Sequence, residues 1–503
     1  MRQRLLAAKL GLAAKLGSSA LMVSCAPAEA QTVEELQRQI DELKATVRAL
    51  SAERGRPRAA APPPGPGRSP ASARRPGPPT EASADAAGSR PRTSGAASPA
   101  SLQLGPPDTP TAPPTYAGRP KTWFERLTLR GYTQLRVNEF LAGDATAPPG
   151  LARLRSVHDG GITDKNNFTF RRIRLILQGD IHERVSIYFQ PDFAVAVGNQ
   201  TAGEPRGGFA ALRDAYVDWF MDDERRTRLR FGQQKVPYGW ENLQSSQNRL
   251  TLDRSDAINS AVPGERDLGI TAYYTPHRVQ RIWDRLAADG QKLFGNYGAF
   301  GVGIYNGQTI NRVERNNDLM TVGMATWPLE LDGLGGAFRG QVLELGGSAY
   351  RNEFHPEIRA GGVSPNGIAE QRVGLHAILY PQPFGLQAEW NWGRGPEYDL
   401  VSRMVESKPL EGGYVQAMYR VEHSPIGPFM PYARWQHYRG GWKVATNAPR
   451  LDTDEFELGI EFQPIKPIEI TLAYSRMNRR EADERRLGRA RGDLFRAQLQ
   501  WNY

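Results

Sequence analysis

The sequence predicts an all-β protein whose main part is a closed antiparallel β-barrel of about sixteen strands that crosses a membrane. Three observations predict this fold. Residues 168–194 alternate between apolar and polar side chains, the candidate strands are even in number with short and long connections between them, and the last strand carries an aromatic face. A chain of 503 residues is long enough for such a barrel and N-terminal attachments.

Residues 168–194 form the clearest pair of predicted strands. Ile173, Leu175 and Leu177 alternate with Arg172 and Arg174, and neighbouring side chains of a strand point to opposite faces. The second half repeats this alternation after a turn of a few residues. A soluble β-sandwich would bury the apolar face against another sheet. A membrane barrel would instead turn that face to lipid and leave the arginines in a wet interior.

Sixteen segments show the alternation expected of strands. They are 127–138, 168–180, 184–194, 210–221, 226–236, 267–276, 295–305, 319–328, 339–352, 370–380, 384–394, 412–422, 428–440, 454–464, 468–478 and 492–503. Short turns on one rim and long loops on the other are typical of outer-membrane barrels with both termini in the periplasm. The connection 277–294 is long where a short turn is due, and it predicts a small helix at the periplasmic rim.

The final strand distinguishes the membrane barrel from a soluble sheet. It places Phe495, Ala497, Leu499, Trp501 and Tyr503 on one face. Such a strand at the edge of a soluble sheet would promote aggregation. In a closed barrel it pairs with the first strand, and its aromatic side chains lie at the membrane interface. Helical spans are excluded, because no run of about 18 apolar residues exists outside the N-terminus.

Residues 1–30 have the pattern of a secretory signal peptide. Basic residues precede an apolar stretch, and Ala28, Glu29 and Ala30 fit a cleavage site with small residues at both ends. The single cysteine, Cys25, lies in this segment, where a lipidation site is the alternative interpretation. The mature chain is therefore expected to have no disulfide bond and no thiolate metal site.

Three further segments follow the signal peptide. Residues 31–52 carry apolar side chains at heptad positions a and d, which predicts a coiled-coil helix that self-associates. Residues 53–120 are rich in Pro, Ala, Ser and Arg and predict a disordered linker, since they cannot bury enough apolar surface to fold. Residues 121–503 contain all the predicted strands and form the barrel domain.

The charge and motif content argue against several function classes. Of the formal net charge of +10, residues 1–120 carry +7, so the barrel domain has no excess that would indicate nucleic-acid binding. The motifs of serine hydrolases, P-loop NTPases and zinc proteases are absent from the sequence. The acidic group at 452–455 is interpreted as part of a loop rim rather than a calcium site. We therefore expect no covalent chemistry, no metal and no cofactor.

Alternation along the strands turns a set of arginines toward the lumen. They are Arg130, Arg136, Arg172, Arg174, Arg228, Arg230 and Arg496. A guanidinium stays charged and offers a fork of donors suited to phosphate or carboxylate, so these side chains would raise the concentration of anions in a narrow pore. The alternative is that they only neutralise lumen acids. Those acids are Asp214, Asp218, Glu389, Glu422, Glu457 and Glu461.

The connection 237–266 is the third long loop. A loop of this length is either folded inside the barrel or mobile outside it, and folded inward it would set the constriction. The cations within or beside it are Lys235, Arg249, Arg254 and Arg266.

Four stretches of the barrel domain carry a family resemblance. They are FRRIRL at 170–175 followed by Gln178-Gly179, LRDAYV at 212–217, RFGQQKVPYG at 230–239 followed by Glu241, and RDLG at 266–269. Together they resemble the phosphate-selective porin O/P family over residues 125–503, most strongly from 168 to 270.

The resemblance implies a sixteen-stranded outer-membrane porin that works as a trimer, with the third loop folded into the pore. It also implies an arginine ladder, to which Arg172, Arg174, Arg228 and Arg230 would belong. The best-known phosphate-specific members add a cluster of lysines at the constriction, for which this sequence offers only Lys235.

The hypothesis is a homotrimeric porin in the lipid bilayer of the outer membrane for passive diffusion of small anions, with phosphate and other oxyanions as candidates. One alternative is a general diffusion porin with weak selectivity. Another is a barrel-anchored tether that contacts the cell wall through residues 31–120. A secreted β-sandwich enzyme is the third.

Overall fold

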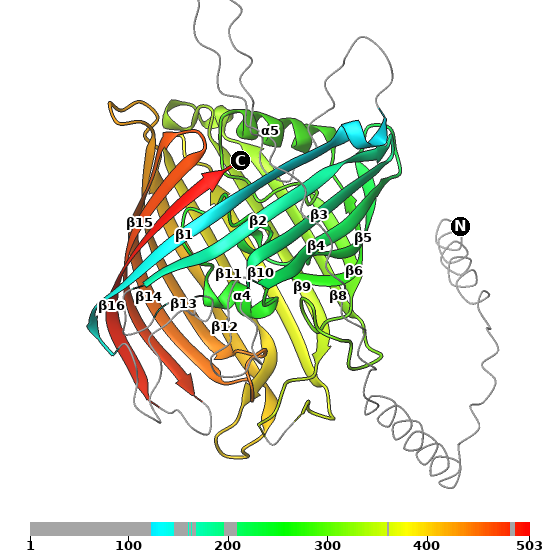
Figure 1. The fold of residues 1–503 in the computed structure, drawn as a ribbon, viewed down its shortest axis with the longest axis vertical. Coiled ribbons are helices and arrows are strands. Elements are labelled where there is room, and N and C mark those ends of the chain that lie inside the picture. The colour runs from blue at the N-terminus through cyan, green and yellow to red at the C-terminus, as the bar shows by residue number, and fades with distance from the viewer. Residues whose placement is uncertain are drawn as a thin grey trace, which may run out of the picture. The chain divides into compact units, whose positions relative to one another are not determined.

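The computed structural model describes residues 122–144, 159, 162, 167–195, 209–359, 362–482 and 488–503. The predicted signal peptide, coiled coil and linker, residues 1–120, lie outside the described residues. Sixteen strands of the described part form one closed antiparallel barrel, in which each strand pairs with its sequence neighbours and β1 pairs with β16 (Figure 1). The predicted fold class is confirmed for the barrel.

Most strands are longer than the segments that were predicted for them. They are β1 (Leu127–Gly143), β2 (Asn167–His182), β3 (Val185–Val195), β4 (Phe209–Phe220), β5 (Thr227–Lys235), β6 (Arg266–Tyr274), β7 (Phe300–Tyr305), β8 (Met320–Glu330), β9 (Val342–Phe354), β10 (Ile368–Leu379), β11 (Phe384–Tyr398), β12 (Val405–Tyr419), β13 (Phe429–Gly441), β14 (Arg450–Ile465), β15 (Ile468–Ala482) and β16 (Arg489–Asn502). Some extensions are rich in polar residues, as at 479–482 of β15 and 489–491 of β16, and an alternation of apolar side chains does not reveal these.

Six short helices accompany the strands in the described part of the chain. They are η1 (Trp123–Arg126), α3 (Trp240–Leu243), α4 (Asp256–Ala261), α5 (His277–Ala288), η2 (Asp332–Leu334) and η3 (Gly336–Phe338). None of the described helices combines the length and the apolar character needed to cross a bilayer. The helix expected in the connection 277–294 is confirmed as α5, on the rim where β1 begins and β16 ends (Figure 1). We call this rim the short-turn rim and the opposite one the long-loop rim.

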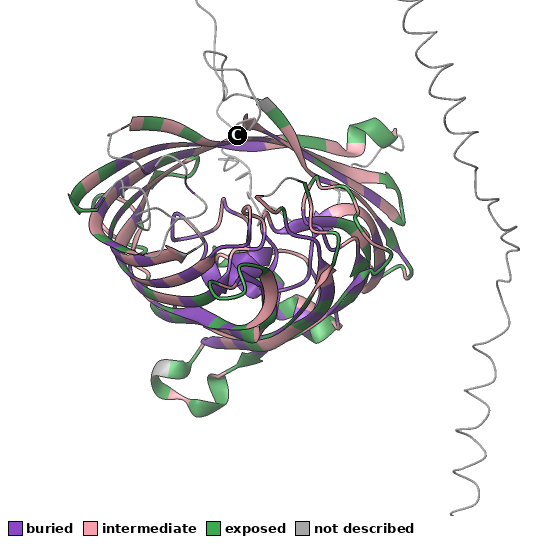
Figure 2. Ribbon diagram, turned by 90° about the horizontal axis from the view of Figure 1, so that it is seen from below, coloured by how far each residue is buried: buried purple, intermediate pink, exposed green. Residues whose placement is uncertain are grey.

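The two faces of the barrel wall differ as expected for a membrane barrel. Leu129 and Phe168 are 70% and 76% exposed on the outside, whereas Arg172 and Arg174 are each 5% exposed on the inside. Buried and exposed residues alternate along the strands around the ring (Figure 2). Because the apolar side chains face outward and the arginines inward, a soluble β-sandwich is excluded.

The ladder between β1 and β16 closes the barrel, and the contact between Tyr503 and Gly131 of β1 extends this ladder by one pair. Their backbones exchange two hydrogen bonds, of 2.7 Å and 3.0 Å, and the Tyr503 ring lies over the glycine. A Cβ atom on Gly131 would lie 2.5 Å from this ring and 2.4 Å from the carbonyl oxygen of Arg174. Real Cβ contacts are never so close, so only glycine fits the closing pair.

We expect Gly131→Ala to lower the free energy of unfolding by about 1–3 kcal/mol, the usual range for an overpacked site. Urea unfolding followed by tryptophan fluorescence would measure it. Gly323→Ala on β8 is the matched control, because the nearest atom to a Cβ there is 3.9 Å away. Equal stability of the two variants would contradict the proposed role of the closing contact.

Candidate functional site: the arginine-rich lumen

The connection between β5 and β6, residues 236–265, is folded inside the barrel; we call it the third loop. Most of its residues are buried, and α3 and α4 lie within the ring of strands (Figure 2). Ser255 caps α4 by accepting a hydrogen bond from the backbone N–H of Ile258. Of the two arrangements that the sequence left open, the structure has the one in which this loop narrows the lumen.

Carboxylates of the third loop bind arginines at two places on the wall, on β1 and β16 and on β13. Asp253 pairs with Arg136 of β1 at 3.2 Å and with Arg496 of β16 at 2.7 Å, while Glu241 pairs with Arg434 of β13 at 2.7 Å. Arg136 and Arg496 therefore face the lumen as predicted, and both hold the loop in place. Each ion pair is almost fully buried, so removing one partner would leave an uncompensated charge, at a cost of about 3–5 kcal/mol.

The arginines of β5 lie on an aromatic wall. Arg230 forms a bidentate pair with Asp218, with distances of 2.7 Å and 2.8 Å, and its guanidinium lies 3.9 Å from the centre of the Tyr216 ring. Arg228 donates to the backbone carbonyl of Asn296. Nearer the short-turn rim, Arg130 donates to the side chain of Gln178 at 3.0 Å.

Two β-bulges add arginines that the alternation rule assigns to the outer face. Gln134 of β1 pairs with Arg172 of β2, and the next residue of β1 pairs with Phe170. Arg171 is therefore the extra residue of β2. On β4, the register with β3 shifts in the same way around Arg213. Arg171 lies 3.6 Å from the inward-facing Asp253 of the third loop, and Arg213 lies 3.5 Å from Asp192. Bulges turn a side chain to a new direction and are common beside functional sites.

Cations of β2, of the bulge in β4, of the third loop and of the two residues that flank this loop form a group that we call the arginine cluster. Its eight cations are Arg171, Arg172, Arg174, Arg213, Lys235, Arg249, Arg254 and Arg266. Among the described residues, four carboxylates lie within ion-pair distance of its members, namely Asp192, Asp214, Asp253 and Glu265. Asp253 is moreover shared with Arg136 and Arg496, so the cluster has a clear excess of positive charge.

Two members of the cluster form no ion pair with the described residues. Arg172, 5% exposed, donates to the side chain of Gln134 at 2.6 Å, and its Nε has no hydrogen-bond partner. Arg249, 6% exposed, has no partner at Nε or Nη2 and lies close enough to Arg172 for their charges to repel. Buried donors without partners are costly. An anion between these two side chains would satisfy them.

The electrostatics of the third loop agree with this shortage of negative charge. Burial lowers the pKa of Arg249 to about 10, and the nearby Arg171 acts in the same direction, whereas Glu241 and Asp253 oppose it. Burial and repulsion from Arg249 hold the pKa of Arg254 well below its usual value. Both shifts are in the direction expected of buried cations with too little negative charge around them.

A second insertion enters the lumen from the short-turn rim. Residues 289–299, which we call the crossing segment, follow α5. Lys292 forms ion pairs of 2.5 Å with Glu461 of β14 and 3.1 Å with Glu469 of β15, and Asn296 binds Arg228 of β5. Since β5 and β14 are seven steps apart in a ring of sixteen strands, these contacts connect opposite walls.

An apolar cluster joins the two insertions. Trp240 of the third loop, Trp283 of α5 and Phe294 of the crossing segment pack together, with ring centroids 5.9 Å and 5.3 Å apart. The indole N–H groups of both tryptophans donate to Glu344 of β9, at 3.2 Å and 2.9 Å. The third loop and α5, which leads into the crossing segment, therefore share one anchor on the wall.

The predicted lumen acids have different positions in the structure. Asp214, Asp218, Glu457 and Glu461 each face a cation inside the barrel. Glu389 instead accepts hydrogen bonds from the backbone of the third loop. Glu422 is wrongly predicted, because β12 ends at Tyr419 and Glu422 lies exposed in the following turn. Among the described residues, no group of His, Cys, Asp and Glu side chains could hold a metal ion.

A comparison with protein-family models identifies the family. The model of "Phosphate-selective porin O and P" matches residues 152–503, which is more than half of the chain. The chain belongs to the phosphate-selective porin O and P family. As a member of this porin family with the barrel described above, it is an outer-membrane porin. The family and the fold indicate a channel rather than an enzyme.

Several solved structures are similar to this porin. The outer-membrane channel DcaP of Acinetobacter baumannii is 14% identical, with a TM-score of 0.46 and coverage of 75% of this chain and 97% of that chain. OmpF of Salmonella typhi, in complex with daunomycin, is 12% identical, with a TM-score of 0.47 and coverage of 75% and 97%. An anion-selective porin from Comamonas acidovorans is 11% identical, with a TM-score of 0.43 and coverage of 75% and 99%. A comparison with curated protein sequences finds no match.

Proposed function

We propose that this porin passes small anions by passive diffusion, and that phosphate and other oxyanions are the solutes its lumen best accommodates. The observation that carries the proposal is the arginine cluster, in which Arg172 and Arg249 have donors without acceptors. A planar guanidinium fork matches two oxygens of a phosphate or carboxylate. An oxyanion that loses part of its hydration here would regain hydrogen bonds from the wall.

The two bulges strengthen this proposal. Arg171 and Arg213 widen the cationic surface from β2 to β4 at the level of the third loop, so an anion would meet several guanidinium groups in succession. Weak binding at several neighbouring sites favours entry without trapping the ion. We infer that all eight cations of the arginine cluster attract the anion, and that Arg172 and Arg249 contact it.

We infer that the short-turn rim faces the periplasm and the long-loop rim the cell exterior, as is usual for outer-membrane barrels. We further propose a cleaved signal peptide at residues 1–30 and a homotrimer. The heptads of residues 31–52 support self-association. Cell-wall contact through residues 31–120 is a separate proposal, and deletion of that segment tests it: a tether would lose envelope attachment while the conductance persists.

The ion preference of the purified porin in planar bilayers tests the main proposal. We expect the reversal potential across a KCl gradient to show a preference for chloride over potassium. We also expect millimolar phosphate to reduce the chloride current, because both ions would compete for the arginine cluster. Equal permeability to chloride and potassium would contradict anion selectivity.

A general diffusion porin is the second candidate. Arg136, Arg230 and Arg496 are each bound to carboxylates, so much of the wall is electrically balanced. If the protein is a general diffusion porin, its preference for chloride over potassium would be small, and phosphate would leave the chloride current unchanged.

A further inference from the structure

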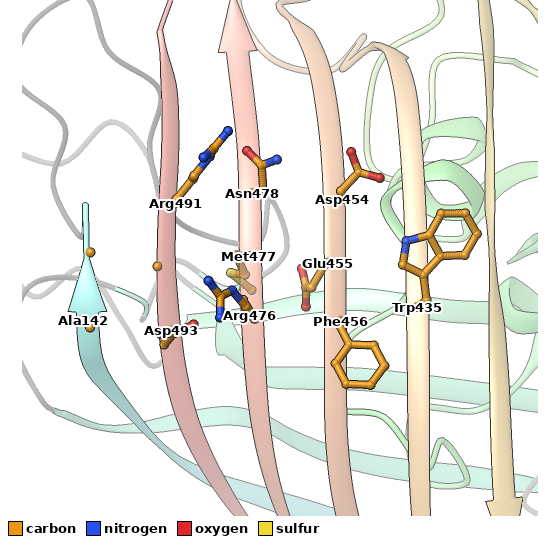
Figure 3. Close-up of a pocket in the computed structure, with 12 residues that line it drawn as sticks. Ala142, Trp435, Asp454, Glu455, Phe456, Arg476, Met477, Asn478, Arg491 and Asp493 are labelled. Atoms are coloured by element: carbon orange, nitrogen blue, oxygen red, sulfur yellow. The ribbon is translucent and has the colours of Figure 1, made fainter.

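The outer wall carries a polar groove near the long-loop rim, on strands β13 to β16. Along these strands the outward-facing residues change from apolar to charged toward the loops. The pairing register places Asp454 beside Asn478 and Asn478 beside Arg491. One row further from the loops, Phe456 is beside Arg476 and Arg476 beside Asp493. Figure 3 shows these side chains on neighbouring strands, facing one side of the sheet.

The groove has a volume of about 490 Å³ and is bounded by Ala142 of β1 and Trp435 of β13 (Figure 3). Two of its side chains, Arg476 and Arg491, are exposed cations that form no ion pair with the described residues. Their positions are diagonal neighbours on adjacent strands, a spacing that long side chains readily bridge.

The carboxylates of the groove are already engaged. Asp454 lies 2.8 Å from Nδ1 of His437, and Asp493 lies close to the hydroxyl of Tyr474. A neighbouring arginine provides a contrast, because Arg489 pairs with Asp452. The guanidinium groups of Arg476 and Arg491 are therefore the groups of the groove that remain available to an anionic ligand.

The remaining edge of the groove is apolar and faces the bilayer. Trp435 is 41% exposed and Phe456 is 44% exposed, and Leu458 continues this surface toward the middle of the wall. Aromatic side chains commonly mark the membrane interface of such barrels. A ligand in the groove would therefore meet two guanidinium groups at the interface and lipid-facing side chains directly below them.

We propose that this groove binds the phosphorylated headgroup of a lipid in the outer leaflet. The phosphate lies between Arg476 and Arg491, Asn478 donates a further hydrogen bond, and an acyl chain follows Phe456 and Leu458. Free phosphate would use only the polar part of the groove. A second copy of the chain would have to bury two unpaired guanidinium groups, which is costly. The site lies outside the lumen, so it is independent of the proposed ion selectivity.

Binding of lipid A, a bisphosphorylated glycolipid, to the full-length porin in detergent tests the proposal. Native mass spectrometry would compare the wild type with the double variant R476Q/R491Q. We expect the double variant to bind lipid A roughly tenfold more weakly or worse, because two charge-assisted contacts are lost. Dephosphorylated lipid A should bind the wild type and the double variant equally.

Two controls make the outcome decisive. Arg351→Gln removes an exposed arginine from the outer face of β9, and it should leave lipid A binding within twofold of the wild type. Single-channel conductance and heat-modifiable gel mobility of R476Q/R491Q should equal those of the wild type, which shows that the barrel is folded. Unchanged lipid A binding in the double variant would overturn the proposal. Displacement of lipid A by millimolar inorganic phosphate would also overturn it and would assign the groove to free phosphate. Loss of oligomers in the double variant would likewise overturn it and would assign the groove to a second copy of the chain.

Discussion

Replacing both Arg172 and Arg249 with glutamine should bring the chloride-to-potassium permeability ratio of the pore close to one. Among the described residues, these are the buried arginines of the cluster without a carboxylate partner, so their charge is less neutralised than that of the paired members of the cluster. Two unit charges 4 Å apart interact by about 1 kcal/mol even in water, which is a factor of about five for each arginine. Reversal potentials of the double variant R172Q/R249Q would measure the change.

The control for this experiment is Arg351→Gln, which removes one positive charge from the outer face and should leave the ratio unchanged. The single-channel conductance of R172Q/R249Q should stay within the range of an open channel, since neither arginine anchors the third loop by an ion pair. A double variant that keeps the wild-type permeability ratio would rule out the role proposed for these two residues. High salt should weaken the wild-type preference, because screening shortens the range of the field.

Releasing the crossing segment should enlarge the pore at the short-turn rim. Lys292 holds this segment to β14 and β15 through Glu461 and Glu469, whose side chains are largely buried. Removing one partner of a buried pair costs about 3–5 kcal/mol, so Lys292→Ala should leave the segment free to move away from this wall. We expect the single-channel conductance to rise roughly 1.5- to 2-fold, with more frequent transitions between levels.

The pH dependence of this contact follows from its carboxylates. Glu461 and Glu469 raise the pKa of Lys292 against the effect of burial, so its ammonium group stays charged throughout the neutral and acidic range. The stabilisation from a raised lysine pKa is complete below the unfolded-state value and is lost only at strongly alkaline pH. The charge of Lys292 should therefore support the contact throughout the neutral and acidic range. The double variant E461Q/E469Q should reproduce the conductance of Lys292→Ala at neutral pH.

Arg285→Ala is the matched control for the crossing segment. This residue belongs to the adjacent helix α5 and forms an exposed ion pair of 2.7 Å with Glu330, on the rim and away from β14. It should leave the conductance unchanged, and Lys292→Arg should retain the wild-type value. If Lys292→Ala conducted like Arg285→Ala, the crossing segment would not limit the pore.

Simple alternation was enough to predict the barrel wall, because one face must meet lipid and the other water along every strand. Arg172, Arg174 and Arg496 could be assigned to the lumen on this basis alone. Arg171 and Arg213 could not, because each is the extra residue of a bulge and a period of two fails where the ladder gains a residue. A tandem of arginines on a predicted strand is a signal that could have indicated such a bulge.

The contacts across the lumen could not be predicted from the sequence, for a different reason. The pairs of Asp253 with Arg136 and Arg496 depend on how thirty residues of irregular chain fold inside the ring. The periodicity of a strand carries no information about that path. Likewise, the unusual length of the connection after β6 predicted a helix on the rim but not that Lys292 would reach the opposite wall.

The meeting of the two insertions has a mechanical consequence. Gln244 of the third loop donates to the backbone carbonyl of Lys292 at 3.0 Å, and Glu344 binds Trp240 of the third loop and Trp283 of α5, the helix before the crossing segment. The third loop and the crossing segment thus connect strands on different sides of the barrel through its interior. An empty barrel can flatten under lateral pressure, whereas one with such internal contacts keeps its diameter. The bore of this porin should therefore change little with the thickness or tension of the surrounding lipid.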